Sequence, residues 1–202
     1  MTTWDDMVPL LAPYVTTAPD MTLREALCAS AADFLAQTYI WVESLDLGQL
    51  TAGSHTYPLV APAVVEGVLW VVVAERELVH THIREVPKSR LALEGKPQYF
   101  WLDNDESVRV WPTPETDEAR FEVGVALKNG LTDTGIPSWI IETWGDAIVS
   151  GAVYRLARIP HKAWSDDKLA LYHKMIFDRA KANARRREYR DISKHIKPRG
   201  FV

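Results

Sequence analysis

Two histidines separated by one residue, His80 and His82, have a type and spacing that could do chemistry. Alternate residues of a β-strand share one face, so the two imidazoles could ligate the same metal ion. A zinc site needs at least one further protein ligand, and the nearby Glu77 and Glu85 are of a type common on any surface. Because no further ligand is evident, a polar sheet face is favoured over a metal centre. We expect no metal and no cofactor.

The single cysteine, Cys28, excludes an intramolecular disulfide framework and a Cys-rich metal site. It lies beside the apolar stripe of an amphipathic segment, and no local histidine is placed to activate its thiol, so core packing is expected. Asp103, Asp105 and Glu106 match part of a calcium loop but lack its glycine and its final glutamate. No glycine-rich phosphate-binding loop occurs either. We therefore expect no catalytic residues and a protein that is not an enzyme.

Charge is distributed unevenly along the 202 residues. Residues 1–154 contain 9 Lys+Arg and 22 Asp+Glu, whereas residues 155–202 contain 14 and 5, so the net charge of −4 combines −13 with +9. Eight tryptophans are more than one core of this size usually needs. Most should be buried, and some should anchor contacts with another protein.

The basic C-terminal segment has two interpretations. Clustered cations are typical of nucleic-acid binding, but they also suit docking into an acidic cleft on a protein partner, with Phe201 as a terminal anchor. Glu188 and Asp191 interrupt the cluster, and the negative charge of residues 1–154 would repel DNA. We favour protein docking and keep nucleic-acid binding as the alternative. The candidate docking residues are Arg185, Arg186, Arg187, Tyr189, Arg190, Lys194, Lys197, Arg199, Phe201 and Val202.

Capping boxes predict where the first helices begin. Thr3 and Asp6 have capping-box spacing before a short helix, and Thr22 and Glu25 have the same spacing before a longer one. The second helix carries an apolar stripe at steps of three and four residues. Its members are Leu27, Ala31, Phe34, Leu35, Thr38 and Trp41.

The pattern from about Leu45 to Leu127 is that of β-structure. Val68–Val73 is a continuous apolar run, which predicts a strand buried on both faces. Residues 98–102 and 107–111 flank a polar turn and predict a hairpin. Alternation over Phe121–Leu127 predicts an antiparallel strand with one covered face.

Helical periodicity returns after Gly135. Pro137 occupies a favoured first helical position, and a stripe follows at four-residue intervals until Pro160. Ser165, Asp166 and Asp167 predict the start of a last helix, which should run to about Tyr189. The stripe of the first of these helices is Ile140, Trp144, Ile148, Ala152 and Leu156; that of the second is Leu169, Tyr172, Ile176 and Ala180. Residues 179–188 include no large apolar side chain, so we expect the second half of the last helix to leave the body.

The predicted fold is α+β: a bundle of an N-terminal helix and two C-terminal helices, with an inserted antiparallel β-domain and an extended basic arm. The expected boundaries are 1–44 and 131–180 for the bundle, 45–130 for the β-rich insertion and 181–202 for the arm. The acidic N-terminus lacks the features of a signal peptide, and no apolar run is long enough to span a membrane. We therefore expect a soluble protein made in the cytosol.

Four islands of the sequence, in order, resemble the head-to-tail adaptor proteins of tailed bacteriophages, also known as head-completion or connector proteins. Three islands are short: Leu23–Leu27 leading to Ala32–Phe34, then Tyr57–Leu59, then Val108–Pro114. The fourth contains Ile136–Trp139, Asp146–Ile148, Gly151, Ala152, Leu156, Pro160, Trp164, Ala170, Tyr172 and Phe177. The resemblance covers residues 4–190 and includes no catalytic fingerprint.

The resemblance implies a structural protein of the virion neck that is assembled in the host cytoplasm. Such adaptors form a twelve-fold ring on the portal, receive the tail or nozzle on the other face, and let DNA pass without specific binding. By position, Arg185–Val202 would be the portal-docking arm. The regions around His80–Ser89 and Asp103–Ser107 would face a neighbouring subunit or the tail, which makes His80, His82, Asp103 and Asp105 candidate interface residues.

Overall fold

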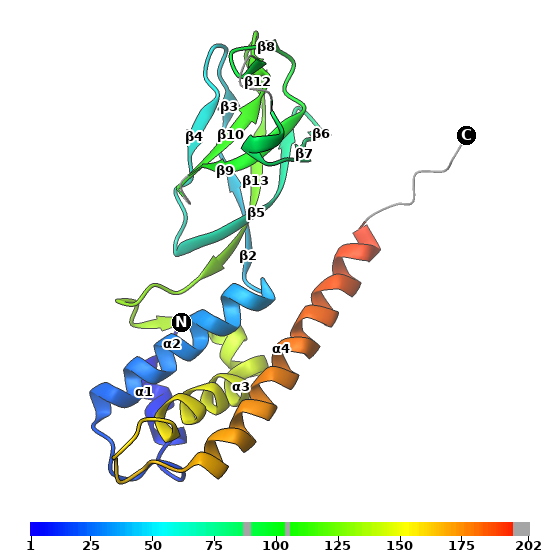
Figure 1. Ribbon diagram of the computed structural model, residues 1–202. Helices are drawn as coiled ribbons and strands as arrows, with labels where there is room; N and C mark the ends of the chain where they lie inside the picture. The colour runs from blue at the N-terminus through cyan, green and yellow to red at the C-terminus, as the bar shows by residue number, and fades with distance from the viewer. Residues whose placement is uncertain (87–89, 104–105, 196–202) are drawn as a thin grey trace. The chain divides into compact units, whose positions relative to one another are not determined.

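The computed structural model describes residues 1–86, 90–103 and 106–195, with side chains described as far as Arg187. The chain forms two compact units (Figure 1). One unit is helical and combines Met1–Trp41 with the chain from Lys128 onward; the other contains the strands of Val42–Leu127. The fold is therefore α+β, as predicted, with a strand unit inserted between two parts of a helical unit.

The helical unit begins with the predicted capping box. Short strand β1 (Thr2–Thr3) leads into α1 (Trp4–Met7) and the 3₁₀ turn η1 (Val8–Leu10), followed by α2 (Asp20–Thr38). The Asp6 carboxylate accepts from the main-chain N–H of Thr3 at 3.0 Å, while the Thr3 hydroxyl accepts from the N–H of Asp6 at 3.4 Å. The first predicted helix start is thus confirmed.

The second predicted capping box is wrong. Helix α2 starts at Asp20, after Pro19 in an extended conformation, so Thr22 and Glu25 lie inside the helix. An aspartate in the first turn complements the helix dipole there. The helix ends at Thr38 because Tyr39 adopts a left-handed conformation with φ of 53°, and Trp41 is buried outside the helix.

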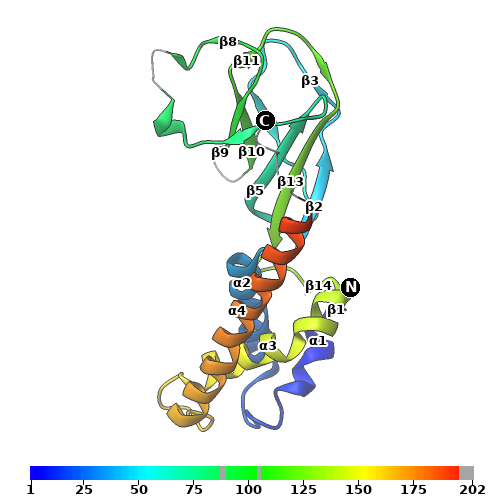
Figure 2. The ribbon, with the colours of Figure 1, turned by 90° about the vertical axis from the view of Figure 1, so that its right-hand side faces the viewer.

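The chain returns to the helical unit through β14 (Gly135–Ile136), which pairs with β1 in antiparallel register (Figure 2). Helix α3 (Ser138–Ala157) follows, with Pro137 just before the helix and not at its first position. Helix α4 (Asp167–His195) is longer than predicted and ends six residues beyond Tyr189. The Asp166 carboxylate caps α4 by accepting from the main-chain N–H groups of Lys168 and Leu169.

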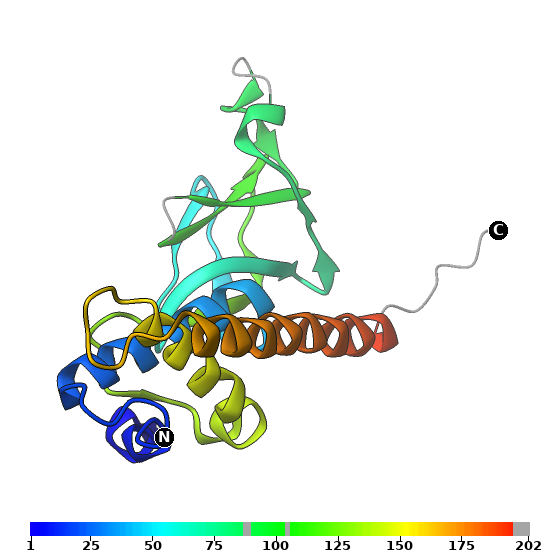
Figure 3. The ribbon, with the colours of Figure 1, turned by 60° about the horizontal axis from the view of Figure 1, so that its bottom comes forward.

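The buried stripe of α4 differs from the predicted one. It consists of Ala170, His173, Phe177 and Ala184. Tyr172 was expected in the stripe but is 62% exposed. The stripe also continues past Ala180, because the packing of α4 against α2 and α3 extends along the helix (Figure 3).

The three long helices meet at Gly151 of α3. A Cβ atom added there would lie 2.1 Å from the Ser30 hydroxyl of α2 and 2.8 Å from the Phe177 ring of α4. Phe34 of α2 contacts the ring of Phe177 and the ring of Trp144. Only glycine allows this approach of the three helices, which fixes α4 on the other two.

The strand unit contains two four-stranded sheets with strand orders β4-β10-β9-β7 and β2-β13-β5-β6, and two-stranded pairs β11-β8 and β12-β3. The first sheet is formed by β4 (Thr56–Pro58), β10 (Ser107–Trp111), β9 (Tyr99–Asp103) and β7 (Val79–His80). The second is formed by β2 (Val42–Asp46), β13 (Phe121–Lys128), β5 (Val64–Val73) and β6 (Arg76–Glu77). The short pairs and the remaining 3₁₀ turn are β11 (Thr113–Pro114), β8 (Glu94–Gly95), β12 (Glu118–Ala119), β3 (Gln49–Leu50) and η2 (Ile83–Glu85).

The predicted hairpin is confirmed as the antiparallel pair β9–β10. The insertion is not wholly antiparallel, since β7 pairs with β9, and β8 with β11, in parallel. Tyr57 from the first sheet packs edge-on against Phe121 from the second, with ring centroids 4.8 Å apart. Aromatic pairs of this geometry add to the core beyond their buried area.

Two predictions about strand faces are wrong in detail. In β5, Val71 and Val73 are buried but Leu69 and Trp70 are half-buried, so this strand is not fully covered on both sides. In β13, Gly124 and Ala126 are buried as well as the predicted face. A Cβ atom on Gly124 would lie 2.1 Å from the Trp70 ring, so the indole of β5 covers β13 on the face expected to be open.

Candidate protein-interaction surface

The two histidines do not share a strand face. Strand β7 ends at His80, whose imidazole packs edge-on against the Phe100 ring with centroids 5.3 Å apart. His82 precedes η2, and its Nδ1 accepts from the main-chain N–H of Arg84 at 3.2 Å. Among the described residues, no group of three or more His, Cys, Asp or Glu side chains could hold a metal ion.

Cys28 is a core residue, as predicted. Its Sγ lies 3.4 Å from the carbonyl oxygen of Gly130 and 3.3 Å from Nδ2 of Asn129. Burial raises the pKa of the Cys28 thiol, although the Asn129 contact opposes the shift. A protonated, buried thiol that contacts a carbonyl is an unreactive one.

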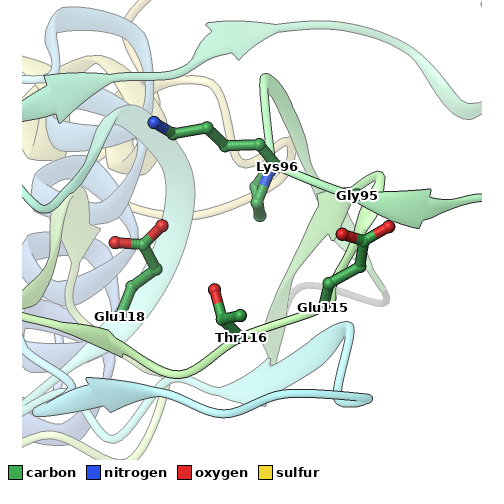
Figure 4. Close-up of a pocket in the computed structure, with 6 residues that line it drawn as sticks. Gly95, Lys96, Glu115, Thr116 and Glu118 are labelled. Carbon is green, nitrogen blue, oxygen red and sulfur yellow. The ribbon is translucent and has the colours of Figure 1, made fainter.

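The cavity shown in Figure 4 lies in the strand unit and has a volume of about 270 Å³. It is lined by Gly95, Lys96, Pro97, Glu115, Thr116 and Glu118. Thr116 projects between the two glutamates (Figure 4), and Glu118 is also paired with Arg76 at 3.4 Å. Charged side chains of both signs line this cavity without a nucleophile and base in contact, so it offers no assembled catalytic group.

One cation of α4, Lys181, is largely buried within the helical unit. The Lys181 side chain is 12% exposed, and its Nζ lies 3.7 Å from a carboxylate oxygen of Asp33 and 3.2 Å from one of Asp178. The same ammonium lies over the Phe177 ring, 4.4 Å from the centroid. Arg155 of α3 also reaches Asp33, at 3.3 Å. Asp33 thus joins cations from α3 and α4 to α2.

Arg185 is bound to the end of α2. Its Nε donates to the main-chain oxygen of Gln37 at 2.6 Å, and its Nη2 donates to the Gln37 side-chain oxygen at 3.1 Å. Carbonyls in the last turn of a helix lack intrahelical partners, and a cation is favourable there. The expectation that the chain leaves α4 uncovered from Lys181 on is therefore wrong; α4 packs on the unit as far as Ala184 and Arg185.

The other predicted docking residues divide into three groups. Arg186 and Arg187 are exposed. Tyr189, Arg190 and Lys194 belong to the last turns of α4. Lys197, Arg199, Phe201 and Val202 lie outside the described residues, as does Asp105 among the interface candidates. Asp103 ends β9 and pairs with Arg109 at 3.9 Å.

Two exposed helix faces were missed in the sequence. Leu171, Tyr172 and Met175 of α4 are 61%, 62% and 66% exposed, and Trp139 of α3 is 48% exposed. The helical periodicity is compatible with these exposed faces, because the residues fall between the buried positions of each helix. Tyr172 was assigned to the core because its spacing from Leu169 and Ile176 also fits a helical stripe.

The chain belongs to the SU10 adaptor protein family, whose model matches residues 2–196. Membership identifies a bacteriophage structural protein of the virion neck that contacts other virion components, in agreement with the resemblance of the four sequence islands. No match was found among curated proteins. Within the described part of the chain, no helix combines the length and apolar character required to cross a membrane.

Proposed function

We propose that this chain is a head-to-tail adaptor. Copies form a twelve-fold ring between the portal and the tail or nozzle, complete the DNA-filled head and leave a channel for the genome. The basic end of α4 and the residues that follow it are the portal-docking arm, assembled onto heads in the host cytoplasm. The family match supports this role, and the anchoring of α4 is the structural observation that carries it.

The anchoring of α4 gives the arm a fixed origin. Asp33 and Gln37 of α2 bind Lys181 and Arg185, so α4 is attached to the rest of the helical unit as far as the turn that contains Arg185. The next two residues, Arg186 and Arg187, are exposed cations, and the helix continues to His195. A helix that continues past this attachment and carries exposed cations is suited to an acidic site on a partner.

The distribution of charge supports passage of DNA without binding. Residues 1–154 carry 22 acids against 9 bases. An acidic surface repels phosphates, so DNA could move through a ring of such subunits without adhering to it. The cations are instead concentrated in the segment assigned to the portal.

The test compares binding of variants to portal-bearing heads. Truncation after Tyr189 removes four cations, and the double variant Arg186→Glu/Arg187→Glu reverses two. Each should reduce binding by at least roughly tenfold, because the proposed partner site is acidic. Both variants keep Lys181 and Arg185 and should melt as the wild type does. Arg158→Glu, a reversal at an exposed position just after α3 and outside the candidate docking and interface residues, is the matched control.

Unchanged binding of the truncated chain would overturn the docking-arm assignment. Binding of the wild type to duplex DNA that falls steeply with salt and is lost in the double variant would instead favour the nucleic-acid alternative.

A further inference from the structure

We propose that the exposed face of α4 in one copy of the chain packs against the exposed N-terminal face of α3 in the next copy. This inference rests on the proposed ring and assigns its subunit contact. The occupant of each face is a second copy of this chain.

The face of α4 is a continuous stripe opposite the buried one. Its residues are Lys168, Tyr172, Met175, Arg179 and Ala182, all exposed. They are separated by alternating steps of four and three residues, the spacing by which one helix contacts another over successive turns. At about 100° per residue, the stripe lies on the side of α4 directly opposite His173 and Phe177, which pack inward.

The stripe and its neighbour Leu171 expose three large apolar side chains side by side on α4. Tyr172 and Met175 are each more than 60% exposed, and Leu171 beside them is 61% exposed. The Tyr172 ring is held edge-on to His173, with centroids 5.3 Å apart, so it is oriented before any partner binds. Burying such side chains against a partner is favourable, and orienting one beforehand reduces the entropic cost.

The face of α3 is acidic with one aromatic anchor. Trp139, Glu142, Thr143 and Asp146 are exposed and occupy positions i, i+3, i+4 and i+7 of a helix. The two carboxylates lie one turn apart, where like charges repel. Among the described residues, neither forms an ion pair, so a cation from another chain would relieve this repulsion.

The two faces match in chemistry and in spacing when the helices run antiparallel, as α3 and α4 do within one copy, where Gly151 lies against Phe177 and Tyr154 lies near Lys174. Trp139 and Asp146 are seven positions apart, and so are Lys168 and Met175. Each interval corresponds to about 10 Å along a helix. The Trp139 ring can therefore meet the Met175 side chain while the Lys168 ammonium meets the Asp146 carboxylate, two turns away.

Within one unit, each exposed face lies on the side of its helix opposite buried residues. The α3 face lies opposite Ile140 and Ile148, and the α4 face lies opposite Phe177. Packing at Gly151 fixes α3 and α4 in place. Two different complementary faces on separate sides of one rigid unit form a head-to-tail contact, which closes into a ring when the rotation allows.

The test is cross-linking on portal-bearing heads with Met175→Cys/Glu142→Cys and a short bis-maleimide. Wild-type Cys28 is buried, so it should not react. We expect a ladder of linked adaptor subunits from the double variant and none from either single variant. Heads that bind the double variant without producing the ladder would overturn the α3–α4 contact and leave the proposed function standing. Failure of the wild type to bind heads would overturn both.

Charge reversal provides a second readout. Lys168→Glu alone and Asp146→Lys alone should each lower the number of adaptors per head by at least about tenfold, because like charges then meet. The combination of the two should restore it. Arg158→Glu, at the exposed end of α3, is the control. Recovery that fails in the combined variant, with melting temperatures unchanged, would contradict the pairing.

Discussion

Arg185 of α4 donates hydrogen bonds to both oxygen atoms of Gln37, the main-chain oxygen at 2.6 Å and the side-chain oxygen at 3.1 Å. Gln37 lies in the last turn of α2, where carbonyl groups have no partner within the helix. One arginine therefore connects the end of α2 to the turn of α4 that also carries the exposed Arg186 and Arg187.

Replacement of Arg185 by alanine should lower the free energy of unfolding by about 0.5–1 kcal/mol, since the hydrogen bonds lie at the surface. Arg186→Ala should change it by less than about 0.5 kcal/mol, because the side chain is exposed. Urea titration monitored by tryptophan fluorescence measures both. Equal effects of the two variants would contradict the structural role of Arg185.

Gly151→Ala should destabilise the helical unit by about 1–3 kcal/mol, because the added methyl group overlaps the Ser30 hydroxyl and the Phe177 ring. Gly145→Ala is the matched control on the same helix, where the nearest atom outside the backbone of α3 is the Ile141 methyl at 3.3 Å. There the higher helix propensity of alanine should offset the contact. Thermal unfolding distinguishes them, and a tolerated alanine at Gly151 would mean that the helices can separate without cost.

The Cys28 thiol should resist alkylation in the folded protein. Burial raises its pKa above the ordinary value of 9.0, so at pH 8 the reactive thiolate is scarce and shielded. Modification by iodoacetamide, followed by mass spectrometry, should become rapid only in denaturant. The unfolded thiol loses its proton first, so stability from this group is present below pH 9 and decreases as pH rises beyond it. Fast labelling of the native chain would be inconsistent with its burial.

His173 should make the helical unit less stable in mild acid. It is 3% exposed, neither ring nitrogen bonds to a described residue, and burial lowers its pKa from 6.5. The unfolded chain takes up a proton near pH 6.5 while the folded one does not, so the free energy of unfolding falls as pH decreases below that value.

The His173→Phe variant isolates this effect. Its free energy of unfolding should decrease less than that of the wild type between pH 7 and pH 5, while the carboxylates titrate in both. His161→Gln, an exposed position, should follow the wild-type curve. Parallel curves for wild type and His173→Phe would show that this imidazole is not the acid-sensitive group.

Local signals were sufficient where the interaction itself is local. The Thr3–Asp6 box, the β9–β10 hairpin and the cap at Asp166 each join residues within a few positions, so the sequence identifies them. Which residues of α4 are buried depends on which side chain packs against Gly151 of α3 and Ser30 of α2. Periodicity alone placed Tyr172 there, whereas Phe177 and His173 occupy the interior.

The candidate surface was predictable in part for the same reason. Clustered cations identify the end of α4 by composition, but the capture of Lys181 and Arg185 by Asp33 and Gln37 joins residues about 150 positions apart, which no pattern indicates. His80 and His82 show the opposite error. Their spacing suggested a shared face, but the strand ends between them.

The insertion of the strand unit between the two parts of the helical unit sets the order of events during synthesis. Val42–Leu127 leaves the ribosome complete while α2 still lacks Trp144 of α3 and Phe177 of α4, whose rings contact Phe34. The strand unit can therefore fold first, and α2 must wait for about 100 further residues before its apolar side is covered. The helical unit can therefore fold completely, and assemble with other chains, only after α4 has been synthesised.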